Sequence, residues 1–374
     1  MKIKHVPWLK CLDCGSQLSI IAGPISEEQI ENGVIGCNKC RRLYPVLGGA
    51  AVLFCRNSGH SLNPAEIATL AALGYAPSDF AYEAKELSSD ERKQVAVLKN
   101  WEYQWDEIHP FTQSDLDSNG FLGQDAFKNF IPIASEKVAG TTVLVGGAGR
   151  GREVYHLSRM GAATIIALDL GREIYAARKL LQSCSSTEIL LIRSDLVNIP
   201  LQTGLVDIAI CDHALQHVHN HRQGFNELAR VTRSEGLTAI CVYSWEGNFL
   251  MTHMVEPAKS VLHRIPLKML FMLSFFPAFV LHFIIMCLYV PAAMIAPAIA
   301  RRIPLFDHMI LWSKNRFITT WMSIFDLFHA PISYHFRREE VARMAEENNM
   351  TIECLRHTNR VLWSMIARKN ATNN

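Results

Sequence analysis

One stretch, TVLVGGAGRG at residues 142–151, constrains the fold of this chain more than any other. It begins as a β-branched apolar run and then carries glycine at every second position. REVYHLSRMGA follows with apolar side chains at helical spacing, and ATIIALDL then has the composition of a second strand. A strand, turn, helix and strand in this order predict an α/β fold with a parallel sheet. Glycines in the first turn let a ligand approach the backbone closely.

The spacing of these glycines separates two classes of ligand. Gly147, Gly149 and Gly151 read GxGxG, whereas a dinucleotide-binding turn reads GxGxxG. Arg152 stands where the third dinucleotide glycine would lie. Asp169 ends the second predicted strand, where a carboxylate can accept hydrogen bonds from both hydroxyls of a ribose. NAD enzymes place an acid there too, so Asp169 alone does not identify the cofactor.

Four segments together resemble the class I S-adenosylmethionine-dependent methyltransferases of the methyltransferase-11 type. They are the glycine turn, LLIRSDLVNIPL, VDIAICDHALQHVHN and FNELARVTRSEGLTAICVYS, in the family's order between residues 143 and 244. The resemblance implies a Rossmann-like sheet of seven strands and S-adenosylmethionine as the cofactor. It also implies a cofactor site made of Val145, Gly147, Gly149, Gly151, Asp169, Leu170, Asp195, Leu196 and Asp212.

Val145 departs from the pattern of that family. The position usually carries an acid that helps to hold the methionine ammonium. Here backbone carbonyls, water or another side chain must hold it. The valine also leaves a non-catalytic scaffold as an alternative function, in which the cofactor site has decayed and the amino-terminal segment recruits partners.

Two CxxC pairs predict a metal site near the amino terminus. CLDCG and CNKC place Cys11, Cys14, Cys37 and Cys40 in two tight turns, which can face each other as the four-sulfur cage that Zn²⁺ favours. No coordination position stays open in such a cage, so we expect a structural zinc. With the following CRRLYPVLGGAAVLF, these cysteines resemble the Trm112-like zinc ribbon. Members of that family attach to methyltransferases or activate them.

The order of these segments predicts three parts: a zinc ribbon at 1–56, a helical linker region at 57–135 and a methyltransferase domain at 136–374. The resemblance to the class I methyltransferases also implies that a last helix and an antiparallel hairpin close the sheet, and FRREEVARMAEENN, TIECLRH and RVLWSMIARK are the segments that match them. The chain end thus belongs to the methyltransferase domain. In the linker region, Trp101, Tyr103 and Trp105 are typical of packing between elements rather than of a ligand cage.

An apolar helical insertion at 250–335 follows the fifth predicted strand, where such enzymes build a substrate lid. Residues 269–300 contain no Lys, Arg, Asp or Glu, and a bilayer crossing needs roughly 20 apolar residues. A single crossing would place strands of one sheet on opposite sides of the membrane. Arg264 and Lys268 before the run and Arg301 and Arg302 after it also indicate that both ends lie on the same side.

We therefore expect a re-entrant or interfacial helical pair that dips into a membrane, bent or broken by Pro277, Pro291 and Pro297. The alternatives are a buried lid over the active site of a soluble enzyme and a contact between copies in a homo-oligomer. The first ten residues lack the apolar segment of a signal peptide. The expected location is the cytoplasm, with peripheral or re-entrant membrane attachment.

Histidines after the fourth predicted strand are candidates for a catalytic base. A hydroxyl acceptor needs such a base, and histidine can act as one near neutral pH. Solvated loop histidines and a metal site are the alternatives there. IFDLFHAPISYHF supplies further polar groups after the apolar run and resembles the acceptor segment of methyltransferases that act on sugars and small metabolites. The candidate catalytic residues from the two segments are His213, His217, Asp326 and His335.

The sequence thus predicts methyl transfer from S-adenosylmethionine to a small-molecule, sugar or lipid-linked acceptor at a membrane surface. An rRNA or tRNA methyltransferase with a zinc module is the alternative enzyme. The net charge of +2 and the lack of a basic stripe count against nucleic acid as a partner.

Overall fold

The computed structural model describes residues 1–56, 60, 62–80, 89–104, 112–181 and 186–371. Among them, one mixed sheet takes the strand order β1-β4-β5-β6-β9-β8-β7-β10-β11-β13-β12. In that order its strands are Leu18–Ala22, Gly33–Cys37, Leu43–Leu47, Ala50–Val52, Glu188–Arg193, Thr164–Asp169, Thr142–Gly146, Val206–Asp212, Thr232–Tyr243, Leu362–Lys369 and Met350–Thr358. A short hairpin of β2 (Ile25–Ser26) and β3 (Gln29–Ile30) stands apart from it.

The part of the sheet from β9 to β12 is the predicted Rossmann-like sheet of seven strands. Its first five strands are parallel, and β13 pairs antiparallel with both β11 and β12. The predicted closure by a carboxyl-terminal hairpin is confirmed. The central strand β7 sends Leu144 into one core and Val143 and Val145 into another. The inner strands β7 and β8 are almost entirely apolar because both faces of the sheet are buried there.

Helices cover both faces of this sheet. α6 (Arg152–Arg159) and α7 (Glu173–Leu181) contribute to the core on the Val143 face. α8 (His221–Val231) and α15 (Arg338–Glu347) contribute to the core on the Leu144 face. Helix α6 starts directly after the glycine turn, as the sequence predicts.

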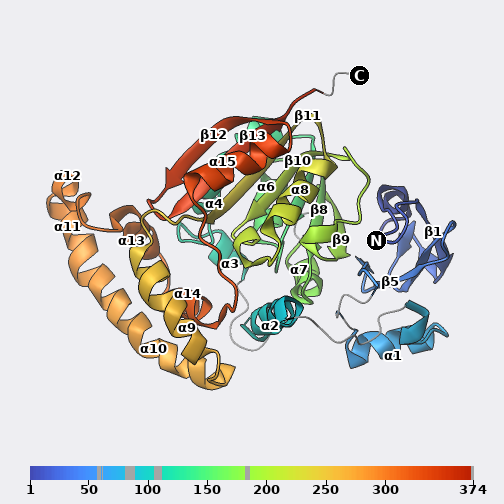
Figure 1. Cartoon of the computed structure of the whole chain (residues 1–374), viewed down its shortest axis with the longest axis horizontal. Coiled ribbons are helices and arrows are strands. Elements are labelled where there is room, and N and C mark those ends of the chain that lie inside the picture. The colour runs from blue at the N-terminus through green and yellow to red at the C-terminus, as the bar shows by residue number, and fades with distance from the viewer. Residues whose placement is uncertain (57–59, 61, 81–88, 105–111, 182–185, 372–374) are drawn as a thin grey trace.

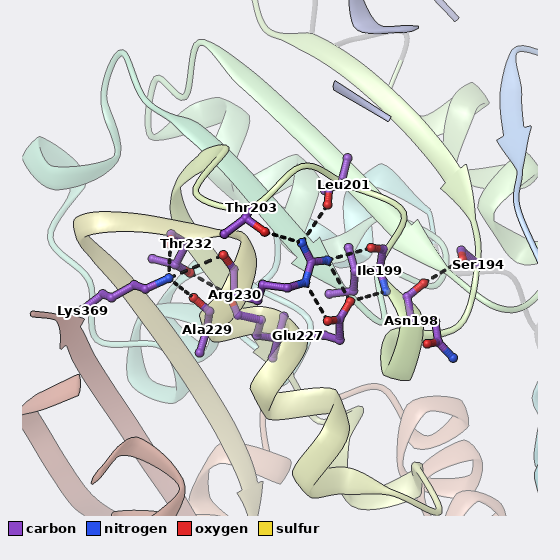
Figure 2. Close-up of polar contacts among 11 residues, drawn as sticks. Ser194, Asn198, Ile199, Leu201, Thr203, Glu227, Ala229, Arg230, Thr232 and Lys369 are labelled. Atoms are coloured by element: carbon purple, nitrogen blue, oxygen red, sulfur yellow. Dashed lines mark hydrogen bonds and ion pairs between the residues drawn. The ribbon is translucent and has the colours of Figure 1, made fainter. Parts of the chain in front are cut away.

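Polar contacts near the carboxyl end of α8 hold the turn that follows β9. Arg230 donates to the carbonyl of Ile199 at 2.8 Å and pairs with Glu227, which accepts from the Ile199 amide at 2.8 Å (Figure 2). Lys369, at the end of β13, donates to the carbonyl of Thr232 at 2.8 Å. Both cations lie where the helix dipole favours positive charge. One helix end therefore fixes both the last strand and the turn after β9.

The amino-terminal ribbon is continuous with the main sheet. β6 pairs parallel with β9, from Ala50 opposite Leu191 to Val52 opposite Arg193. The ribbon residue Tyr44 also belongs to the core that contains side chains of β8 and β9. The boundary at residue 56 remains a prediction, but the strands on its two sides share one sheet and one core.

The linker region and the insertion are helical. In the linker, α1 (Pro64–Ala72), η2 (Pro77–Phe80), α2 (Ser89–Tyr103), α3 (Gln113–Leu116), α4 (Gln124–Phe130) and α5 (Ser135–Val138) precede β7. In the insertion, η6 (Met251–Val255), α9 (Glu256–Leu262), α10 (Leu267–Ile284), η7 (Ile285–Tyr289), α11 (Val290–Ile295), α12 (Pro297–Ala300), α13 (Phe306–Trp312) and α14 (Phe317–His329) follow β11. Figure 1 shows α10 to α12 on the side of the molecule opposite the ribbon.

The predicted helical pair is wrong, because the helical run from Leu267 to Ile295 is continuous over 29 residues. Pro277 lies inside α10, and Pro291 lies in the first turn of α11, directly after the π-helical segment η7. A proline removes one hydrogen bond from a helix, which the helix can absorb as a bend. The run ends only at Ala296, whose φ of −145° and ψ of 68° are not helical.

Candidate active site

A cavity of about 260 Å³ opens at the carboxyl edge of the parallel strands. Its walls come from the turns after β7, β8, β9 and β10, from helix α2 and from the end of α14. The strand order reverses at β7, since β8 lies on one side of it and β10 on the other. Ligands of open parallel sheets bind at such a reversal point.

The glycine turn forms the floor of the cavity. Gly147 has a φ of +75°, and a Cβ atom there would lie 2.2 Å from the Cβ of Ala214. Gly149 has a φ of +48°, and no atom lies within 4 Å of where its Cβ would be. The first glycine is thus required by packing, whereas the second leaves open space for a ligand. Gly151, with a φ of +90°, is the N-cap of α6 and does not line the cavity.

Asp169 is held ready as a hydrogen-bond acceptor at the end of β8. Its two carboxylate oxygens accept from the backbone amides of Gly149 at 2.7 Å and Gly171 at 2.8 Å. Burial raises its pKa, while hydrogen bonds from these amides act in the opposite direction. The carboxylate lines the cavity and has lone pairs left for the hydroxyls of a ribose. This prepared acceptor and the open space at Gly149 fit the nucleoside part of S-adenosylmethionine.

The other predicted cofactor residues divide into two groups. Leu170, Asp195, Leu196 and Asp212 line the cavity. Val145 does not, because its side chain is fully buried in the core beneath the turn. The position that carries an acid in the resembled family is therefore a packing position here.

Charged groups converge at the end of β10. Asp212 accepts from the guanidinium of Arg152 on one oxygen and lies 2.5 Å from the Nδ1 of His213 on the other. Burial would raise the pKa of Asp212, but the neighbouring His213 and Arg152 outweigh it and hold the pKa below its ordinary value. Glu153 accepts from the Nε of Arg152 at 2.8 Å and also lines the cavity.

His213 has a strained backbone, with a φ of +54°. A non-glycine residue in that conformation costs about 1–3 kcal/mol and persists where the surroundings fix it. The imidazole meets the rings of Phe130 and Phe121 edge-on, with centroids 4.8 and 5.6 Å away. These contacts and Asp212 set the orientation of the imidazole at the cavity wall.

His217 is a neutral imidazole in the same wall. Its Nδ1 donates to the carbonyl of Ile332 at 2.7 Å, which leaves Nε2 without a proton. Burial lowers the pKa of His217 to about 3. The rings of Trp101 and Tyr243 lie 5.4 and 5.7 Å from it. Such a histidine can accept a hydrogen bond but is a weak base.

Of the two catalytic residues predicted after the apolar run, only one lines the cavity. Asp326 lines it, and burial raises the pKa of this carboxyl. His329 lies beside Asp326, with 3.7 Å between its Nε2 and the carboxylate. His335 does not line the cavity, because it packs behind Tyr243 at 5.6 Å between ring centroids. Burial lowers the pKa of His335 to about 4.

Helix α2 supplies a cavity wall that the sequence does not indicate. Trp101, predicted as a packing residue, lines the cavity together with Val97. Glu102 fastens the helix to the turn after β8 through two 2.9 Å contacts with Arg172. The amide of Asn100 donates to the carbonyl of His329 at 2.7 Å and so joins α2 to the insertion. Trp105 lies outside the described residues.

The four predicted cysteine ligands come together in the ribbon. Their sulfur atoms all lie within 4.8 Å of one another, with 3.5 Å between Cys11 and Cys40 and 3.4 Å between Cys14 and Cys37. Around a tetrahedral zinc with Zn–S distances of about 2.3 Å, sulfur atoms lie about 3.8 Å apart. The four thiols therefore fit a zinc ion without rearrangement of the backbone.

A second group with metal-ligand chemistry lies in the cavity wall, namely Asp212, His213 and Cys241. Burial raises the pKa of Cys241 well above its ordinary value, which favours the neutral thiol over the thiolate that binds metals. Asp212 already pairs with Arg152. His217, His219 and His221 do not join this group, so the alternative of a histidine-rich metal site after β10 does not form among the described residues.

A model of the methyltransferase domain family matches residues 144–240. This segment is a methyltransferase domain. It includes the glycine turn, Asp169, Asp195 and Asp212, which line the cavity. The protein is accordingly an S-adenosylmethionine-dependent methyltransferase with a Rossmann-like sheet. A search of curated proteins found no match.

Several solved methyltransferase structures are similar to this chain. The 1,6-didemethyltoxoflavin-N1-methyltransferase of Burkholderia thailandensis is 11% identical, over 77% of this chain and 94% of its own. The magnesium protoporphyrin IX methyltransferase of Synechocystis PCC 6803 is 13% identical, over 74% and 100%. A Haloferax volcanii complex that contains the Trm112 methyltransferase activator is 10% identical, over 73% and 98%. Each has a TM-score of 0.43 and carries no argument about the acceptor.

Proposed function

We propose that the enzyme methylates a hydroxyl group of a small, lipid-linked or otherwise apolar acceptor at a membrane surface. The observation that carries the proposal is the arrangement of Asp212 and His213 in the cavity wall, beside the prepared carboxylate of Asp169. A histidine oriented by a buried carboxylate is the arrangement that removes a proton from a hydroxyl.

In this proposal Asp169 holds the ribose of the cofactor, and Asp195 and Leu196 border its adenine. When bound, S-adenosylmethionine supplies an electrophilic methyl group, so much of the rate depends on positioning. The Nε2 of His213 accepts the proton of the acceptor hydroxyl. Asp212 fixes the tautomer of His213 and stabilises the imidazolium that forms. His217 stays neutral and can orient the same hydroxyl by accepting or sharing its hydrogen bond.

The insertion is proposed to form the acceptor side of the cavity. It places Asp326 in the wall, opposite the loops that hold the cofactor. Trp101 and Tyr243 add aromatic surface, which suits an acceptor with an apolar part. The same insertion carries the apolar helix α10 on its outer side, so acceptor binding and membrane contact would belong to one segment.

The exposed side chains of α10 and α11 support membrane contact. Phe276 is 71% exposed, Phe283 60% and Ile295 82%, and only 22% of the most apolar window of Leu267–Ile295 is buried. By length and composition this helix could cross a membrane. Burying one such side chain contributes about 1.5–3 kcal/mol. We favour a helix that lies on the surface, because the chain enters the insertion from β11 and leads from it to β12 and β13 of the same sheet.

The four cysteines of the ribbon are proposed to hold one structural zinc ion. Zinc would stabilise a module that is too small to build a large core alone. The ribbon would then act as a permanently attached support for β9 and the turn that follows it.

The test is incubation of the full-length enzyme, carrying a labelled methyl donor, with separate lipid, small-molecule and RNA fractions. We expect label in the lipid or apolar small-molecule fraction, and none with Asp169→Ala. His213→Gln should lower the rate about 100-fold or more, since a general base contributes 10²–10⁴-fold. Label in RNA alone would support the nucleic-acid alternative. No label and no cofactor binding by calorimetry would support the non-catalytic scaffold.

A further inference from the structure

We infer that Glu153 and Arg152 form a clamp for the amino-acid end of the cofactor, in which Glu153 takes over the role of the acid that is absent at Val145. The inference deepens the proposed function and rests on its cofactor site. It assigns the ammonium of the cofactor to Glu153 and the carboxylate to Arg152. Asp212 acts as a positioning residue for Arg152.

The clamp lies in the part of the cavity next to the glycine turn. Arg152 and Glu153 are the first two residues of α6, directly after Gly151. Arg152, Glu153 and Asp212 all line the cavity, and they are 7%, 6% and 5% exposed. A buried position against the cavity gives these charges a strong effect on a ligand, because water screens them little.

Arg152 is held in one orientation by its neighbours. Its Nη2 contacts both Asp212 and Glu153, and its Nε donates to Glu153 at 2.8 Å. The rings of Phe121 and Phe130 lie 5.5 and 6.0 Å from its guanidinium carbon. The Nη1 group hydrogen-bonds to no residue in the described part of the chain. It is therefore the donor that can bind a ligand carboxylate.

Charge balance favours Glu153 as the group that binds an ammonium. Two carboxylates face one guanidinium, so the group carries one negative charge in excess when both acids are ionised. Asp212 uses its two oxygens for Arg152 and for His213. Glu153 contacts Arg152 through Oε1 only, which leaves Oε2 for a ligand. A buried carboxylate with one oxygen to spare is stabilised by a cationic partner.

Protonation of Glu153 gives the clamp a second property. Burial, together with the charge of Asp212, raises the pKa of Glu153, whereas Arg152 lowers it. An arriving ammonium favours the ionised form, so binding releases a proton from any enzyme that holds Glu153 protonated. Ligands without the amine release none through this group.

Calorimetry with ligands that differ only at the amino-acid end tests the clamp. S-adenosylhomocysteine carries the ammonium and the carboxylate, its decarboxylated analogue lacks the carboxylate, and 5′-methylthioadenosine lacks both. We expect Glu153→Gln to weaken the binding of S-adenosylhomocysteine about 10-fold, the effect of losing a hydrogen bond to a charged group. The affinity for 5′-methylthioadenosine should change less than twofold. Glu346→Gln, on the exposed side of α15, is the matched control and should change neither.

Arg152→Lys should weaken the binding of S-adenosylhomocysteine but not that of the decarboxylated ligand. An equal loss for all ligands in either variant would overturn the clamp, because it would show a structural effect alone. If both variants fail to fold, the wild-type enzyme still decides: its preference for S-adenosylhomocysteine over 5′-methylthioadenosine should fall as the pH is lowered, and a constant preference would overturn the clamp. Failure of the wild type to bind any of the ligands would instead reject the proposed cofactor site.

Discussion

The ribbon and the insertion are both additions to the seven-stranded sheet, but they are attached in different ways. The ribbon joins the sheet through backbone pairing of β6 with β9 and shares a core with it. The insertion forms a separate small core around Ala278, Ile285 and Trp312 and leaves its outer face exposed. We therefore expect changes in the ribbon to alter stability throughout the domain. Changes on the outer face of the insertion should alter association and leave stability unchanged.

Loss of the proposed ribbon zinc should have the largest effect. Cys37→Ser, or treatment with a chelator, should destabilise the protein by more than about 4 kcal/mol, because loss of a metal is one of the few changes with so large an effect. Because β6 and β9 are paired, the ribbon and the main sheet should unfold in one transition. Thermal unfolding, monitored by hydrogen exchange of the β9 amides, can detect this. Independent melting of residues 1–56 would contradict this part of the comparison.

The apolar face of the insertion is the second test. Phe276→Ser combined with Phe283→Ser should weaken binding to liposomes by about 3–6 kcal/mol, because each buried phenylalanine contributes about 1.5–3 kcal/mol. The melting temperature should stay the same, since both rings are more than half exposed. Co-sedimentation with vesicles measures the binding. Two results together would show instead that this face is a contact between copies: the wild type does not bind vesicles, and the double variant loses the self-association of the wild type.

Asp169→Ala separates the cofactor site from both additions. It should weaken the binding of S-adenosylhomocysteine by about 1.5–3 kcal/mol through the loss of hydrogen bonds to a charged group. Vesicle binding and zinc content should not change, because Asp169 lies at the end of β8 and touches neither the ribbon cysteines nor α10. Calorimetry beside elemental analysis checks both statements, and an unchanged affinity would reject Asp169 as a ligand residue.

The smallest expected effect concerns the surface between the ribbon and β9. Lys4 and Lys2 hold the pKa of Glu188 at about 2, with the hydrogen bond from Lys4 as the largest cause. A depressed carboxyl pKa stabilises the fold above the unfolded value and loses that stabilisation as the pH falls from about 4.5 to 2. Glu188 is partly exposed, so solvent screening limits the effect to about 0.5–1 kcal/mol. Glu188→Gln should lower stability by that amount at pH 7 and by nothing at pH 2.

The parts of the site that follow strands could be predicted from the sequence. Asp169 and Asp212 each end an apolar run, and the carboxyl ends of parallel strands meet at one edge of the sheet. Glu153 could not be found in this way, because an acid in the first turn of a helix usually faces solvent and favours the helix dipole. Its role depends on Asp212, which lies 59 residues later in the chain and meets it only in the folded sheet.

Long-range contacts explain the other omissions. Trp101 reaches the cavity because Asn100 binds the carbonyl of His329, a contact between positions 229 residues apart that no local pattern indicates. The chain does not break at Pro277 or Pro291, since the helix continues through both as far as Ile295, and it ends at Ala296, directly before Pro297. The sequence was therefore least informative about contacts between segments that lie far apart in the chain.

The pairing of β6 with β9 also protects the molecule against aggregation. Without the ribbon, β9 would be an edge strand with the apolar sequence EILLIR, and its free backbone groups could pair with another chain. The ribbon moves the edge of the sheet four strands away, to the short and irregular strand β1. A chain shortened to residues 136–374 would lose this cover, so this fragment should be less soluble than the full-length enzyme.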